Sequence, residues 1–108
     1  MRKLLVIIDM QEGFRSSNLL MLIPKLRELI SNFNGDKMFT IYENHEESNF
    51  VKRLNWGKFI SNEDRELLLE LRDFNLEMLK HNSYTVFSKN FVETRLREYD
   101  EIYLAGVY

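Results

Sequence analysis

Two charged side chains stand at positions where an α/β protein could use them for chemistry. Asp9 ends the apolar run Leu4–Ile8, and Lys80 follows the short β-like segment Asn75–Leu79. Open α/β sheets bind ligands beyond the carboxyl ends of their strands, and both side chains are predicted to lie there. A carboxylate and an ammonium group in that place could act on a ligand. They could equally form a structural ion pair or belong to two unrelated turns, and residue types alone leave these alternatives open.

The composition limits the classes of function. The 108 residues, of which 44% are hydrophobic and 30% charged, suit one domain. A net charge of −2 without a basic stripe argues against nucleic-acid or membrane-surface binding. The chain has no cysteine, which excludes a disulfide framework and a thiolate metal site within it. Met1–Lys3 lead straight into the first apolar run, so we expect no signal peptide and a cytoplasmic protein.

Apolar periodicity predicts strands that alternate with helices. The unbroken run Leu4–Ile8 is typical of a strand buried on both faces. Helical spacing predicts a helix over about 20–33, with Pro24 in its first turn. The other predicted elements are strands at 38–43, 75–79 and 101–105, a helix capped by Ser61, and a helix at 91–99. This order indicates an α/β fold with a parallel sheet and right-handed crossovers.

Aromatic side chains mark possible ligand-contacting segments. The longest aperiodic segment, Asn44–Ile60, contains Trp56, and loops of this length often line a pocket. We therefore take Phe14, Trp56 and Tyr84 as candidate substrate-binding residues. Plain core packing, or a small satellite cluster under a surface loop, explains such aromatic residues equally well.

Three segments, in order along the whole chain, resemble the isochorismatase-like cysteine hydrolases, the group that includes the nicotinamidases. Leu4–Phe14 is similar to the first-strand signature, in which apolar residues precede D-M-Q, two variable residues and Phe. Lys80 precedes the aromatic segment Tyr84–Phe87, with one residue more than usual between the Lys and the Phe. Ile102–Val107 is similar to the fourth strand, which ends in Gly.

The resemblance implies a mechanism and a topology. The group uses an Asp–Lys–Cys triad, so Asp9 would be the general base and Lys80 would help hold the site in its charged form, close to Asp9. Such groups favour the reactive thiolate over the thiol. The fold would be a Rossmann-like three-layer α/β/α arrangement with strand order 3-2-1-4. The Cys would fall a few residues beyond Tyr108, so residues 1–108 would be one truncated domain without the C-terminal strands.

The nicotinamidase branch also binds a divalent metal through Asp and His residues after the second strand. Glu43 and His45 stand at the matching place, but Ser48 and Asn49 occupy the region where a further His is expected. Two ligands are too few for a zinc-type site, so Glu43 and His45 are weak candidates and we expect no metal or other cofactor. His81, beside Lys80, is interpreted as a solvated residue.

The resulting hypothesis is a hydrolase of a small amide or related small molecule, inactive as given because the Cys is absent. The alternative is a non-catalytic α/β pseudoenzyme or interaction module. A receiver-like signalling domain ranks last, because Asp9 is a single carboxylate where that class needs a cluster. We expect the fourth strand to be an exposed apolar edge, which favours a homo-oligomer.

Overall fold

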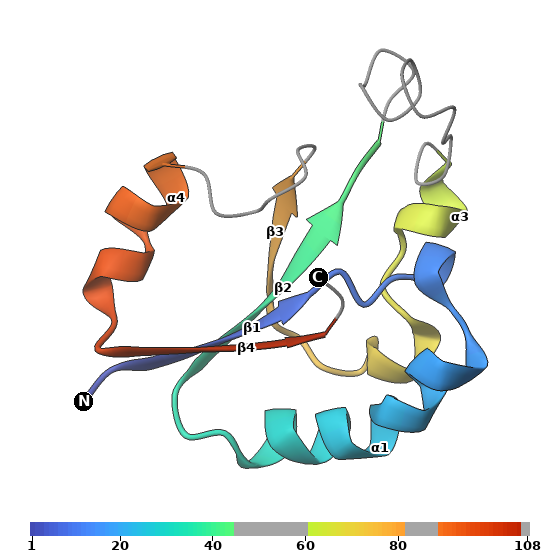
Figure 1. Cartoon of the computed structure of the whole chain (residues 1–108), viewed down its shortest axis with the longest axis horizontal. Helices are drawn as coiled ribbons and strands as arrows, with labels where there is room; N and C mark the ends of the chain where they lie inside the picture. The colour runs from blue at the N-terminus through green and yellow to red at the C-terminus, as the bar shows by residue number, and fades with distance from the viewer. Residues whose placement is uncertain (45–60, 82–88, 107–108) are drawn as a thin grey trace.

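The computed structural model describes residues 1–44, 61–81 and 89–106 (Figure 1). Its centre is a four-stranded sheet in the order β3-β2-β1-β4, and all three strand pairs are parallel. The strands are β1 (Lys3–Ile8), β2 (Asp36–Tyr42), β3 (Glu77–His81) and β4 (Glu101–Gly106). The predicted α/β class, parallel pairing and strand order are therefore confirmed.

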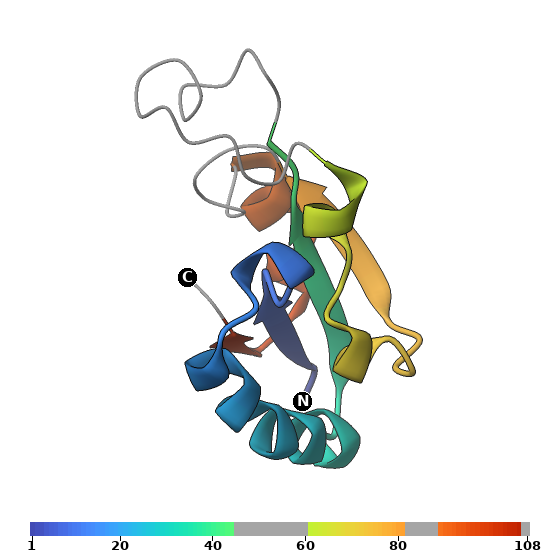
Figure 2. The same cartoon turned by 90° about the vertical axis from the view of Figure 1, so that its right-hand side faces the viewer.

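Helices cover the two faces of this sheet (Figures 1 and 2). Alternate residues of a strand point to opposite faces. Leu5 and Ile7 of β1 pack in the cluster that contains the buried face of α1 (Ser17–Asn32), whereas Val6 packs with Phe91 of α4 (Lys89–Thr94). Every residue of Leu4–Ile8 is buried, as its unbroken apolar sequence predicts.

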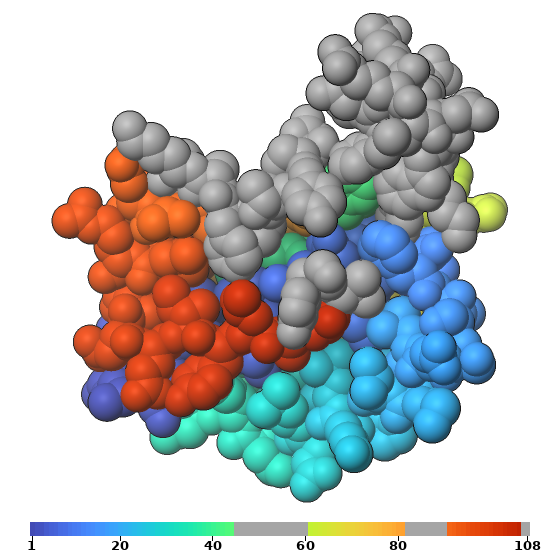
Figure 3. All heavy atoms as spheres, viewed as in Figure 1, coloured from blue at the N-terminus to red at the C-terminus, as the bar shows by residue number. Residues whose placement is uncertain are grey.

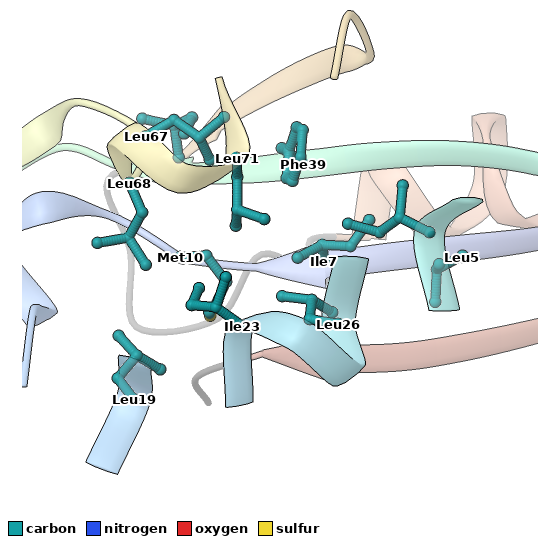
Figure 4. Close-up of a cluster of buried hydrophobic side chains, with 12 residues drawn as sticks. Leu5, Ile7, Met10, Leu19, Ile23, Leu26, Phe39, Leu67, Leu68 and Leu71 are labelled. Carbon is teal, nitrogen blue, oxygen red and sulfur yellow. The ribbon is translucent and has the colours of Figure 1, made fainter. Parts of the chain in front are cut away.

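The larger cluster also includes Met10 and the leucines at 67, 68 and 71 from the segment before β3, and Figure 4 shows these side chains in one group with those of α1. The prediction of one helix carrying these leucines after Ser61 is wrong. Ser61 does cap a helix, but α3 (Asn62–Arg65) is a single turn. The chain then extends, because the Leu68 N–H donates to the Met10 carbonyl at 2.9 Å, and the 3-10 turn η2 (Leu69–Leu71) follows.

Other element bounds also differ from the predictions. Helix α1 starts three residues earlier, at Ser17, because the Ser16 hydroxyl caps it by accepting from the Leu19 N–H at 3.1 Å. Pro24 therefore lies inside the helix rather than in its first turn, at an exposed position. Helix α4 ends early and is followed by the 3-10 turn η3 (Leu96–Glu98). Among the described helices, none combines the length and apolar character that crossing a membrane requires.

Strand β4 forms one edge of the sheet and pairs only with β1 in the described part of the chain. Figure 3 shows its red atoms at the surface between α4 and α1. The side chains of Ile102, Tyr103 and Leu104 are 39%, 44% and 47% exposed. The prediction of an exposed apolar edge strand is confirmed, and the homo-oligomer that it favours stays a prediction.

Candidate active site

Asp9 follows β1 directly and has a left-handed backbone conformation, with φ of 52°. Asp adopts this region more readily than most residues. The Asp9 N–H donates to the hydroxyl of Thr40 at 3.1 Å, and that hydroxyl donates back to Asp9 Oδ1 at 2.8 Å. Since Thr40 is a buried residue of β2, the neighbouring strand fixes both the backbone and the carboxylate of Asp9.

His81, the last residue of β3, makes the second contact to this carboxylate. Its Nε2 lies 2.8 Å from Asp9 Oδ1, and the two side chains are only 8% and 15% exposed. With Asp9 ionised, its carboxylate only accepts hydrogen bonds, and the proton of this contact is assigned to His81 Nε2. Two donors thus converge on Oδ1, while in residues 1–44, 61–81 and 89–106 no hydrogen bond reaches Oδ2. We call Asp9, Thr40 and His81 the Asp9 cluster.

Lys80 stands at the same end of the sheet as Asp9, as predicted, but its ionic partner among the described residues is Glu43. Its Nζ lies 3.7 Å from Glu43 Oε2, and its side chain is 68% exposed. No ion pair joins Lys80 to Asp9 among the described residues. The reason is strand alternation, which places Lys80 and His81 on opposite faces of β3.

The interpretation of His81 as a solvated residue is wrong. It pairs with Tyr42 in the register of β2 and β3, and it lies beside the buried Thr40. One signal in the sequence could have identified it. The segment has one residue more than usual between Lys80 and Phe87. Counting back from the Phe with the usual spacing therefore reaches His81.

Gln11 holds the loop after Asp9 in place, a role that sequence reasoning missed. Its side chain is fully buried. Its amide nitrogen donates to the carbonyls of Tyr42 and Arg65, both at 2.9 Å, and its amide oxygen accepts from the Tyr42 N–H at 2.9 Å. A buried amide with these bonds ties the end of β1 to the end of β2. The D-M-Q motif therefore supplies both the carboxylate and its support.

The Tyr42 ring lies beside the Asp9 cluster, and a separate group of charged side chains lies outside it. The Tyr42 ring lies 5.4 Å from the His81 ring, tilted by 51°. Burial raises the pKa of Tyr42, and the negative charge of Asp9 raises it further, so the phenol stays neutral. The Glu43 carboxylate lies within 4.0 Å of both Lys80 and Arg65. These cations are therefore engaged outside the cluster.

The described residues do not fit a divalent metal of the nicotinamidase kind. Among them, no three His, Cys, Asp or Glu side chains lie together as a ligand set. Glu43 contacts two cations instead, and His45 lies outside the described residues. We derive no chemical step through a metal.

The three aromatic candidates are only partly placed. Phe14 ends the 3-10 turn η1 (Glu12–Phe14). It is partly buried and packs against the larger hydrophobic cluster, which contains the buried face of α1. Trp56 and Tyr84 lie outside the described residues. Substrate binding by these residues stays a prediction.

No protein-family model matches the sequence, and no curated protein matches it significantly. Its fold is similar to solved hydrolases. N-carbamoylsarcosine amidase from Thermoplasma acidophilum superposes with a TM-score of 0.81 at 16% identity, over 98% of this chain and 68% of the amidase. An isochorismatase-like hydrolase from Alkaliphilus metalliredigens gives 0.78 at 15%, over 100% and 68%. A nicotinamidase from Bacillus subtilis gives 0.72 at 22%, over 99% and 71%. Likeness at these identities shows a shared fold.

Proposed function

We propose that this chain supplies the Asp-bearing part of an isochorismatase-like hydrolase that acts on a small amide or related small molecule. The observation that carries the proposal is the Asp9 cluster. It holds a nearly buried carboxylate by one oxygen at the carboxyl end of the central strand. The other oxygen, Oδ2, can accept a proton. The shared fold with an amidase and a nicotinamidase supports the same class of reaction.

In the proposed reaction Asp9 is the general base and a thiol is the nucleophile. The base takes the thiol proton, and the thiolate attacks the amide carbonyl. The C–N bond then breaks as the proton passes from Asp9 to the leaving amine, and water hydrolyses the thioester to the acid and regenerates the thiol. Oxyanion donors would stabilise the tetrahedral intermediate. The 108 residues contain no cysteine, so they cannot form a thioacyl intermediate by themselves. We propose that the nucleophile comes from a Cys encoded beyond codon 108.

The experiment is a panel of small amides, nicotinamide and N-carbamoylsarcosine included, assayed for ammonia release. We expect no release above buffer from the 108-residue chain. A version that includes the following codons, if they encode the Cys, is expected to hydrolyse at least one amide. Asp9→Asn in that version should abolish the activity. Equal activity from both lengths would contradict the thiol mechanism.

The second candidate is a non-catalytic α/β module, and the absence of cysteine from the 108 residues favours it. The encoding gene separates the two candidates. If no Cys follows residue 108 and no amide is hydrolysed, the non-catalytic function replaces the hydrolase.

A further inference from the structure

We propose that His81, and not Lys80, is the positively charged partner of Asp9 in this chain. The pairing stands on geometry. Its meaning for catalysis rests on the proposed function, in which a cation beside the general base holds the site in its charged form. His81 acts through Asp9, so it is a positioning residue.

The geometry favours the His81 imidazole over the Lys80 ammonium group as the partner of Asp9. His81 Nε2 contacts Asp9 Oδ1 at 2.8 Å, and its side chain is almost fully enclosed. Lys80 is mostly exposed, and its Nζ forms an ion pair with Glu43. The Thr40 hydroxyl reaches the same oxygen as His81. Two strands therefore aim their donors at one carboxylate oxygen, while Lys80 extends from the opposite face of β3.

The charged and titratable groups around His81 come from three strands and a helix. Strand β1 leads to Asp9, and β2 leads to the neutral Tyr42 phenol and to Glu43. Lys80 of β3 and Arg65 of α3 both contact Glu43. Among the described residues, the nearest charge to His81 is thus the Asp9 carboxylate with which it bonds.

Replacing a lysine by a histidine makes the site sensitive to pH. A lysine keeps its charge well above neutral pH, whereas a histidine changes charge between about pH 5 and 8. The Asp9–His81 pair is neutral when the imidazole is protonated and carries one negative charge when it is not. Since a cation favours the thiolate form of a nearby thiol, His81 supports the thiolate only while its imidazole is protonated.

The first experiment uses the 108-residue chain and does not depend on activity. NMR follows the carboxyl carbon of Asp9 and the ring signals of His45 and His81 across about pH 5 to 8. We expect the Asp9 carboxyl signal to move together with the His81 ring signals. His81→Gln should remove that step, and the matched control Lys80→Gln should keep it. A step that survives in His81→Gln, or no step in the wild type, would overturn the proposal.

Two further variants keep the test decisive if His81→Gln does not fold. In Asp9→Asn, the His81 ring signals should change. In His81→Lys, a dispersed amide spectrum with no Asp9 step in the window supports the pairing. Unchanged His81 ring signals in Asp9→Asn would count against it.

The second experiment measures pH profiles in a version that hydrolyses an amide. His81→Gln should lose about tenfold or more in kcat/KM at the acid side of the window. His81→Lys should keep activity and lose the decline at rising pH, and Lys80→Gln should follow the wild type. A loss in Lys80→Gln equal to that in His81→Gln would refute the assignment. If no version hydrolyses an amide, the proposed function fails while the NMR result still decides the pairing.

Discussion

At the scale of single residues, Asp9 depends on neighbours from two other strands. Thr40 and His81 meet on one of its oxygens, and its own backbone takes a left-handed turn to present that oxygen. A free carboxylate at a strand end would sample several rotamers. Here two donors restrict it and leave Oδ2 as the proton-accepting atom, which is the orientation that the proposed reaction needs.

Thr40→Val tests how much the hydroxyl contributes to this arrangement. The variant keeps the approximate shape of the side chain and removes both hydrogen bonds to Asp9. We expect the free energy of unfolding to fall by about 1–2 kcal/mol, because buried polar groups lose a partner. Urea denaturation measures the change. Ser31→Ala, at an exposed position of α1, is the control and should stay within about 0.5 kcal/mol of the wild type. A smaller loss at Thr40 than at Ser31 would contradict the role of the hydroxyl.

The sequence was sufficient to predict Asp9 as a candidate site residue. Residue types alone were not sufficient to predict that His81 contacts it. Asp9 follows an apolar run and lies in a recognisable motif. Lys80 and His81 are adjacent in the sequence, so their side chains point to opposite faces of β3. Residue types do not show which of the two faces lies toward Asp9. The one-residue excess before Phe87 carried that information.

At the scale of elements, buried strands were easier to predict than edge elements. The run Leu4–Ile8 is buried throughout, so its composition reflects both covered faces. Strand β3 is an edge strand with mostly exposed or half-buried residues, and its predicted end fell at Leu79 rather than His81. The leucines after Ser61 have helical spacing, but backbone bonds to the Met10 and Gln11 segment hold them in an extended and 3-10 path. Such long-range bonds leave no local signal.

The exposed β4 strand carries a prediction of association. Its three exposed apolar side chains and its outer edge resemble surfaces that pair with other chains. We expect the apparent mass of the 108-residue chain to rise with concentration in sedimentation equilibrium. Leu104→Lys should reduce that association because it adds a charge to the edge.

Leu69→Lys is the matched control for this prediction. Leu69 is exposed as well, but it lies in η2, away from β4 in the chain. This variant should associate as the wild type does. A monomeric wild type at high concentration, or an equal effect of both variants, would contradict an interface at β4.

At the scale of the whole molecule, alternation of strands and helices was sufficient to predict the layers and the parallel sheet. What it could not provide is the set of contacts between distant segments. Asp9 is 31 residues from Thr40 and 72 from His81, and Gln11 is 54 from Arg65. The fold brings these residues to one end of the sheet, so the candidate site is a property of the tertiary structure.

The central claim is that the partner of the Asp9 carboxylate is the His81 imidazole and not the Lys80 ammonium group. A double-mutant cycle tests this claim most directly. Urea unfolding of Asp9→Asn, His81→Gln and the double variant gives the coupling free energy, and the same cycle with Lys80→Gln is the reference. We predict a coupling of about 1–2 kcal/mol between Asp9 and His81, as expected for a hydrogen bond to a charged group. The coupling between Asp9 and Lys80 should lie within about 0.5 kcal/mol of zero. Strong coupling to Lys80 together with none to His81 would contradict the account.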